Sequence, residues 1–135
     1  MKQIKDAYDR PWPLDDVVEG VGPGWEDIVR RLVTDLFALG WDGDLHQIKE
    51  KFGGLRFYIG VGNEALWKRI DQAEDESMRT CEQCGQPGET SSWGGYWINA
   101  LCPAHGKERQ DQITADRKAA VGRNHALAEE RLQKG

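Results

Sequence analysis

Residues 79–105 read RTCEQCGQPGETSSWGGYWINALCPAH and carry the strongest pattern in the chain. A C-x-x-C pair, Cys81 and Cys84, is followed after 17 residues by a C-x-x-H pair, Cys102 and His105. Each pair places two ligands on one tight turn, and together they form a Cys₃His set suited to tetrahedral zinc. The sequence therefore predicts a structural Zn²⁺ site within residues 80–106, in a zinc-ribbon or treble-clef-like module.

Four protein ligands leave no position for the water molecule that a catalytic zinc keeps. The zinc-deaminase pattern needs H-x-E ahead of P-C-x-x-C, and the chain has neither. An HNH-type nuclease would need a histidine between the knuckles, where residues 85–101 contain none. The pattern favours a non-enzymatic protein, and an enzyme with an unrecognised site stays open as an alternative.

Between the two knuckles, Gly94-Gly95 can turn a short hairpin, with Trp93, Tyr96 and Trp97 around it. Such aromatic residues either form the small core that a zinc module needs or stay exposed and bind a partner. Because the sequence is compatible with both roles, the three aromatics are candidate partner-binding residues.

Residues 24–79, ahead of the zinc module, are expected to form a helix–hairpin–helix body. Apolar residues at helical spacing predict a first helix over about 24–39, which Gly40 ends. Asn63 is a candidate N-cap for a second helix over about 64–79.

The segment between these helices predicts a β-hairpin that turns at Gly53-Gly54 and places Ile48 opposite Ile59. One face of the hairpin is apolar apart from Glu50, and His46 is expected on it as a core histidine. The opposite face carries a basic and aromatic patch, a second candidate partner-binding surface: Lys49, Lys51, Arg56 and Tyr58.

The second helix bears an acidic stripe: Asp71, Glu74, Asp75 and Glu76. Acidic runs of this kind are usually solvated, but this one is denser than solubility requires. It is the preferred partner-binding surface, ahead of the basic hairpin face.

Two flanking segments complete the organisation. Residues 1–23 contain three prolines and are expected to form an irregular arm anchored by Tyr8, Trp12 and Leu14. Residues 107–135 predict a charged C-terminal helix, with His125 on its surface. Its apolar residues are few, so it either packs along a narrow stripe or projects and becomes ordered on a partner. That stripe is spaced by seven: Ile113, Ala120 and Leu127.

The 135 residues include 18 Lys+Arg and 23 Asp+Glu, a net charge of −5. Residues 1–105 hold 11 basic and 18 acidic side chains (−7), and the remainder hold 7 and 5 (+2). This balance argues against broad binding to nucleic acid, which requires clustered cations. A nucleic-acid-binding zinc module remains the alternative, built from the basic hairpin face and three cations of the tail: Arg117, Lys118 and Arg123.

No stretch approaches the ~18 consecutive apolar residues of a membrane span, and MKQIKDAYDRPWP lacks the apolar core of a signal peptide. Three cysteines, two of them in C-x-x-C, disfavour a disulfide framework. A cytoplasmic protein without membrane association is expected.

Several segments together resemble a family of small uncharacterised proteins encoded in phages, prophages and some bacterial genomes. They are QIKEKFGGLRFYIG (47–60), RTCEQCGQPG (79–88), GGYW (94–97) and LCPAH (101–105). The resemblance covers residues 24–106 and implies a zinc-binding protein of phage origin, with Cys81, Cys84, Cys102 and His105 matching the metal ligands. Its location would then be the host cytoplasm.

The expected fold is α+β, a small helix and β-hairpin body with a zinc-knuckle module and a C-terminal helix. The expected function is protein–protein interaction, in which the acidic body occupies and inhibits a host or defence protein whose binding groove attracts negative charge.

Overall fold

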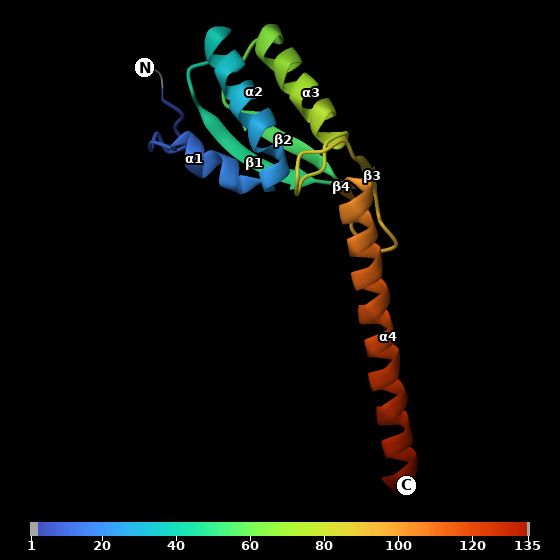
Figure 1. Ribbon diagram of the computed structural model, residues 1–135. Coiled ribbons are helices and arrows are strands. Elements are labelled where there is room, and N and C mark those ends of the chain that lie inside the picture. The colour runs from blue at the N-terminus through green and yellow to red at the C-terminus, as the bar shows by residue number, and fades with distance from the viewer. Residues whose placement is uncertain (1–2, 135) are drawn as a thin grey trace.

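The computed structural model describes the backbone of residues 3–134 and the side chains of residues 3–125 and of Leu127. It confirms the α+β class, with helices and two antiparallel hairpins (Figure 1). The elements in chain order are α1 (Leu14–Val17), η1 (Val18–Gly20), η2 (Pro23–Trp25), α2 (Glu26–Ala38), β1 (Leu45–Lys51), β2 (Gly54–Ile59), α3 (Glu64–Met78), β3 (Glu89–Ser91), β4 (Asn99–Leu101) and α4 (Pro103–Lys134).

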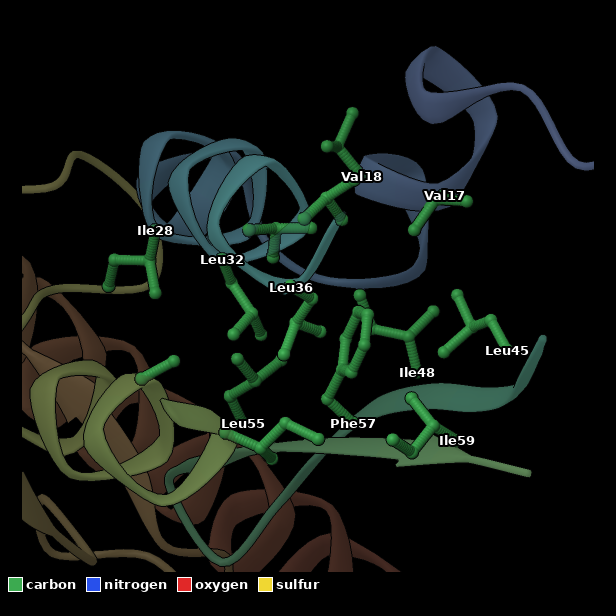
Figure 2. Close-up of a cluster of buried hydrophobic side chains, with 14 of the residues drawn as sticks. Val17, Val18, Ile28, Leu32, Leu36, Leu45, Ile48, Leu55, Phe57 and Ile59 are labelled. Carbon is green, nitrogen blue, oxygen red and sulfur yellow. The ribbon is translucent and has the colours of Figure 1, made fainter. Parts of the chain in front are cut away.

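Helices α2 and α3 lie side by side and cover one face of the β1–β2 hairpin (Figure 1). The amphipathic face of α2 directs Leu32 and Leu36 towards Leu55 and Phe57 of the hairpin (Figure 2). These four side chains are at most 2% exposed. Burying each one stabilises the fold by roughly 1.5–3 kcal/mol, so this layer supplies the main core.

The ends of both helices follow the predicted signals. The chain turns out of α2 at Gly40, whose φ of +98° suits a residue without a Cβ. Asn63 caps α3, because its Oδ1 accepts a hydrogen bond from the backbone N–H of Leu66 at 3.1 Å.

The hairpin turns one residue earlier than predicted, at Phe52-Gly53. Both residues have positive φ, +54° and +79°, as a two-residue type I′ turn requires. Ile48 therefore faces Phe57 instead of Ile59. From Gln47 to Lys51 each cross-strand partner shifts by two positions along the facing strand, so these side chains keep their predicted faces. Phe52 becomes an exposed turn residue.

The N-terminal arm is less irregular than predicted, because α1 and η1 form within it. Val17 and Val18 from these helices are buried and anchor the arm in the core (Figure 2). Trp12 and Leu14 pack partly against the same core, whereas Tyr8 is 79% exposed and anchors nothing.

Strands β3 and β4 form a second small hairpin beyond α3. They are joined by loop 92–98 rather than by a tight Gly94-Gly95 turn, and the chain reverses at Trp93 and Gly94, both at positive φ. Helix α4 begins at Pro103, four residues before the predicted start, and projects from the rest of the molecule as a long rod (Figure 1).

Candidate metal centre

The four predicted ligands converge, and their ligand atoms all lie within 4.8 Å of one another. Cys84 Sγ lies 3.7 Å from Cys102 Sγ, while His105 Nδ1 lies 3.5 Å from Cys81 Sγ and 3.2 Å from Cys102 Sγ. A tetrahedral ion with bonds of about 2.3 Å to sulfur and 2.0 Å to nitrogen separates its ligands by roughly 3.5–3.8 Å. The cluster therefore fits one tetrahedral metal ion.

Local turns hold each ligand in place. Cys81 N–H donates to the carbonyl of Gln86 at 2.8 Å, and Gly85 N–H donates to the carbonyl of Cys81 at 2.9 Å, which closes the first knuckle. Cys102 follows β4, and the N–H of His105, in the first turn of α4, donates to the Cys102 sulfur at 3.5 Å. A bound ion would tie the end of α3 to the start of α4.

Two of the three thiol groups, those of Cys81 and Cys102, are prepared for metal binding. Burial raises the pKa of Cys81, but the backbone N–H groups of Cys102, Cys84 and Gln83 outweigh burial and lower that pKa to about 6. The N–H of His105 likewise lowers the pKa of Cys102. Both groups therefore favour the thiolate, which is the form that binds metal ions.

Two hydrogen bonds from η2, here called the clamp, hold the first knuckle, and the sequence did not predict them. Gly24 N–H donates to the carbonyl of Glu82 at 2.8 Å, and the buried Trp25 donates from Nε1 to the carbonyl of Thr80 at 2.9 Å. A Cβ on Gly24 would overlap the carbonyl oxygen of Cys81. The only sequence signal for this clamp is the G-P-G segment ahead of the tryptophan.

Of the three aromatic residues in loop 92–98, Trp93 belongs to the core of the metal module. It is 9% exposed, packs with Cys81 and Leu101, and donates from Nε1 to the carbonyl of Asn99 at 3.1 Å. Gly106 makes room for it, because a Cβ there would overlap the indole ring.

Tyr96 and Trp97 are instead exposed, by 87% and 67%. Their rings meet edge to face with centroids 5.3 Å apart. Gly95 sits against Ile113 of α4, where a Cβ would lie 2.6 Å from Cδ1. The loop therefore rests on α4 and presents the aromatic pair outward.

The acidic stripe on α3 does not form one continuous free surface. Glu76 makes an ion pair with Arg31 of α2 at 2.6 Å, and Glu74 lies 3.9 Å from Arg56. Asp71 and Asp75 remain exposed. The surface available to a partner is therefore smaller than the sequence suggests.

The basic hairpin face has the composition that the sequence predicts. Lys49 lies directly opposite Arg56 across the strands. The Lys49 ammonium lies 6.0 Å from the ring centroid of Tyr58, and Lys51 lies 5.5 Å from that of Phe52. Aromatic and cationic groups thus alternate on this face.

His46 is not a core histidine. An irregularity in strand pairing between Leu45 and Gln47 turns its side chain outward, where Nε2 meets Asp44 Oδ2 at 3.1 Å. A β-bulge redirects side chains in this way. His125 is exposed on α4, as predicted.

The chain matches no family model, no curated protein and no solved structure. None of the helices within the described residues is both long and apolar enough to cross a membrane.

Proposed function

We propose that this protein is a zinc-stabilised interaction module that binds a partner protein through the exposed pair Tyr96 and Trp97. The observation that carries the proposal is the convergence of four ligands in the same module as a loop that presents two large, exposed aromatic side chains. The metal would act structurally, and the loop would be the working surface.

Zinc is the ion that suits this donor set. Three sulfurs and one imidazole nitrogen are soft or borderline ligands, whereas Mg²⁺ and Ca²⁺ prefer oxygen. Four protein donors also complete the tetrahedron, which is typical of structural zinc and leaves no position for a reacting water.

The aromatic pair has the character of a binding hot spot. Tyrosine and tryptophan dominate the energetics of protein interfaces, and they favour binding most when they are fixed before the partner arrives. The buried Trp93 and the contact of Gly95 with Ile113 fix this loop from two sides.

The partner we propose is a host or defence protein that this chain inhibits. This part of the proposal is supported by the resemblance of residues 24–106 to phage-encoded proteins and by the charge of −7 over residues 1–105. An acidic body can occupy a groove that attracts anions on another protein.

The test compares partner capture by three tagged, zinc-loaded proteins: the unmodified chain, Tyr96→Ser/Trp97→Ser, and the control Val61→Ser, which changes an 81% exposed residue of the β2–α3 turn. We expect one protein, quantified by mass spectrometry, to bind the unmodified chain and the control but not the double variant. Purified partner and chain should then reproduce this binding directly. Equal capture by all three would overturn the assignment of the loop.

A second candidate function, nucleic-acid binding, is favoured by the Lys49–Tyr58 and Lys51–Phe52 contacts on the hairpin face. Base stacking on aromatic side chains beside cations is the usual mode for single strands. A gel shift with a single-stranded oligonucleotide at two salt concentrations tests it. Binding that weakens steeply with salt and is lost in Lys49→Glu/Lys51→Glu would support this function.

A further inference from the structure

The distal part of α4, from Thr114 to Leu127, projects beyond the metal module (Figure 1). All its described side chains are exposed except Ala120, which is half-buried. Helices gain most of their stability in proteins from tertiary packing, and an isolated helix of this length is marginal in water. A surface that packs against this segment would therefore stabilise it.

This segment is basic, in contrast to the body. Its described side chains include Arg117, Lys118 and Arg123 but only one acid, Asp116. Arg117 and Lys118 precede Val121 by four and three residues, so these three side chains share one side of the helix, the α4 row. Val121 is 67% exposed. Arg123 lies on another side of the helix.

Helix α3 carries a complementary set, Trp67, Asp71 and Asp75, which we name the α3 row. The spacing of four residues places them along one side of α3. Trp67 is 43% exposed, and within the described residues neither aspartate forms an ion pair. The negative charge of this row comes from the two aspartates, and Lys68 and Arg79 lie at its borders.

We propose that the α4 row of one copy of this chain docks against the α3 row of a second copy, with the two helices antiparallel. Val121 then covers Trp67, and Arg117 and Lys118 lie beside Asp71. The antiparallel arrangement also opposes the two helix dipoles. Within one chain the contact cannot form, because α4 points away from α3 (Figure 1).

Charge complementarity favours a second copy over nucleic acid as the occupant. Two cations flanking a valine contact few phosphates, so they give weak binding to a polyanion. The body of another copy offers both the net charge of −7 over residues 1–105 and an exposed tryptophan for the valine. The interface should be weak and sensitive to salt, because its ion pairs remain near solvent.

Sedimentation velocity of the zinc-loaded protein over a range of concentrations, at low and high salt, tests the proposal. We expect reversible association at low salt that weakens at least tenfold in Arg117→Glu. The matched control Arg123→Glu makes the same charge change on another side of α4 and should associate as the unmodified chain does. A chain that stays monomeric throughout, or equal weakening in both variants, would overturn the proposal.

A second experiment reverses the charges of each row in a separate variant and then mixes the two variants. Asp71→Lys/Asp75→Lys and Arg117→Glu/Lys118→Glu should each lose self-association, and an equimolar mixture should recover it. Failure to recover, with zinc content and circular dichroism unchanged, would contradict the pairing of these two rows. Neither row includes Tyr96 or Trp97, so partner capture by the aromatic loop is measured independently of this result.

Discussion

Glu74 is a half-buried carboxyl on α3, and burial is the main cause that raises its pKa. Arg56 opposes this rise, whereas Asp71 and Asp75 add to it. A carboxyl whose pKa is higher in the folded than in the unfolded state destabilises the fold when it ionises. This destabilisation is absent below the unfolded pKa and develops as the pH rises through the folded value.

We therefore expect Glu74→Gln to increase the free energy of unfolding at pH 7 by about a few tenths of a kcal/mol. The gain is small because solvent screens a carboxyl that is partly exposed. The gain should shrink as the pH falls from 7 towards 4, where Glu74 itself becomes neutral. Urea unfolding at a series of pH values measures it, with Glu108→Gln, which changes an exposed glutamate of α4, as the control. A glutamine variant less stable than the unmodified chain at pH 7 would show that the contact with Arg56 outweighs burial.

Gly106 and Gly122 both lie in α4, but only Gly106 is closely packed against another side chain. A Cβ at Gly106 would overlap the Trp93 ring, whereas a Cβ at Gly122 would meet nothing within 4 Å. Replacing a helical glycine by alanine normally stabilises by ~1 kcal/mol. We expect that gain for Gly122→Ala, and a loss of about 1–3 kcal/mol for Gly106→Ala because the indole must move. Urea unfolding of both variants with zinc present measures the contrast, and equal stabilities would contradict the packing of Trp93.

The β1–β2 turn also joins the hairpin to the metal module. Gly53 has a φ of +79°, and a Cβ there would lie 2.8 Å from Thr90 Cγ2 of β3. Gly40 also has positive φ, but the space around it is open. We expect Gly40→Ala to cost about 1 kcal/mol from backbone strain alone, and Gly53→Ala to cost more because it also displaces β3. Thermal unfolding compares them, and equal losses would mean that the turn does not pack on β3.

Elements with strong local signals could be predicted from the sequence. Three features were predicted because each is set by residues close together in the chain. They are the apolar periodicity of α2, the N-cap at Asn63 and the spacing of the metal ligands. The hairpin register could not be read so well, because Phe52-Gly53 and Gly53-Gly54 both allow a two-residue turn. In the structure the turn is formed at Phe52-Gly53, and Phe52 adopts a positive φ.

What the sequence did not reveal depends on how separate segments pack together and on the detail of strand pairing. The clamp of Gly24 on the carbonyl of Glu82 joins residues far apart in the chain. The outward turn of His46 follows from a local irregularity in strand pairing. Likewise, only the packed structure shows that Arg31 neutralises Glu76.

The Cys₃His cluster is the joint between the body and the projecting helix. Cys81 follows α3 and is clamped by η2, while His105 belongs to α4 and Cys102 immediately precedes it. The core beside the cluster is small, formed by Trp93 and Leu101 with two of the cysteines. In a module with so little apolar core, a bound metal ion would supply part of the folding free energy.

Removing the metal should therefore unfold the joint. We expect a chelator to lower the melting temperature by roughly 10–20 °C, the result of losing several kcal/mol of metal-linked stability. Added Zn²⁺ should restore it and Mg²⁺ should not, because the donors are sulfur and nitrogen. Cys84→Ser should melt near the chelated value and respond little to chelator. If elemental analysis shows one zinc per chain removed and the melting temperature does not change, the cluster is not what holds α4 to the body.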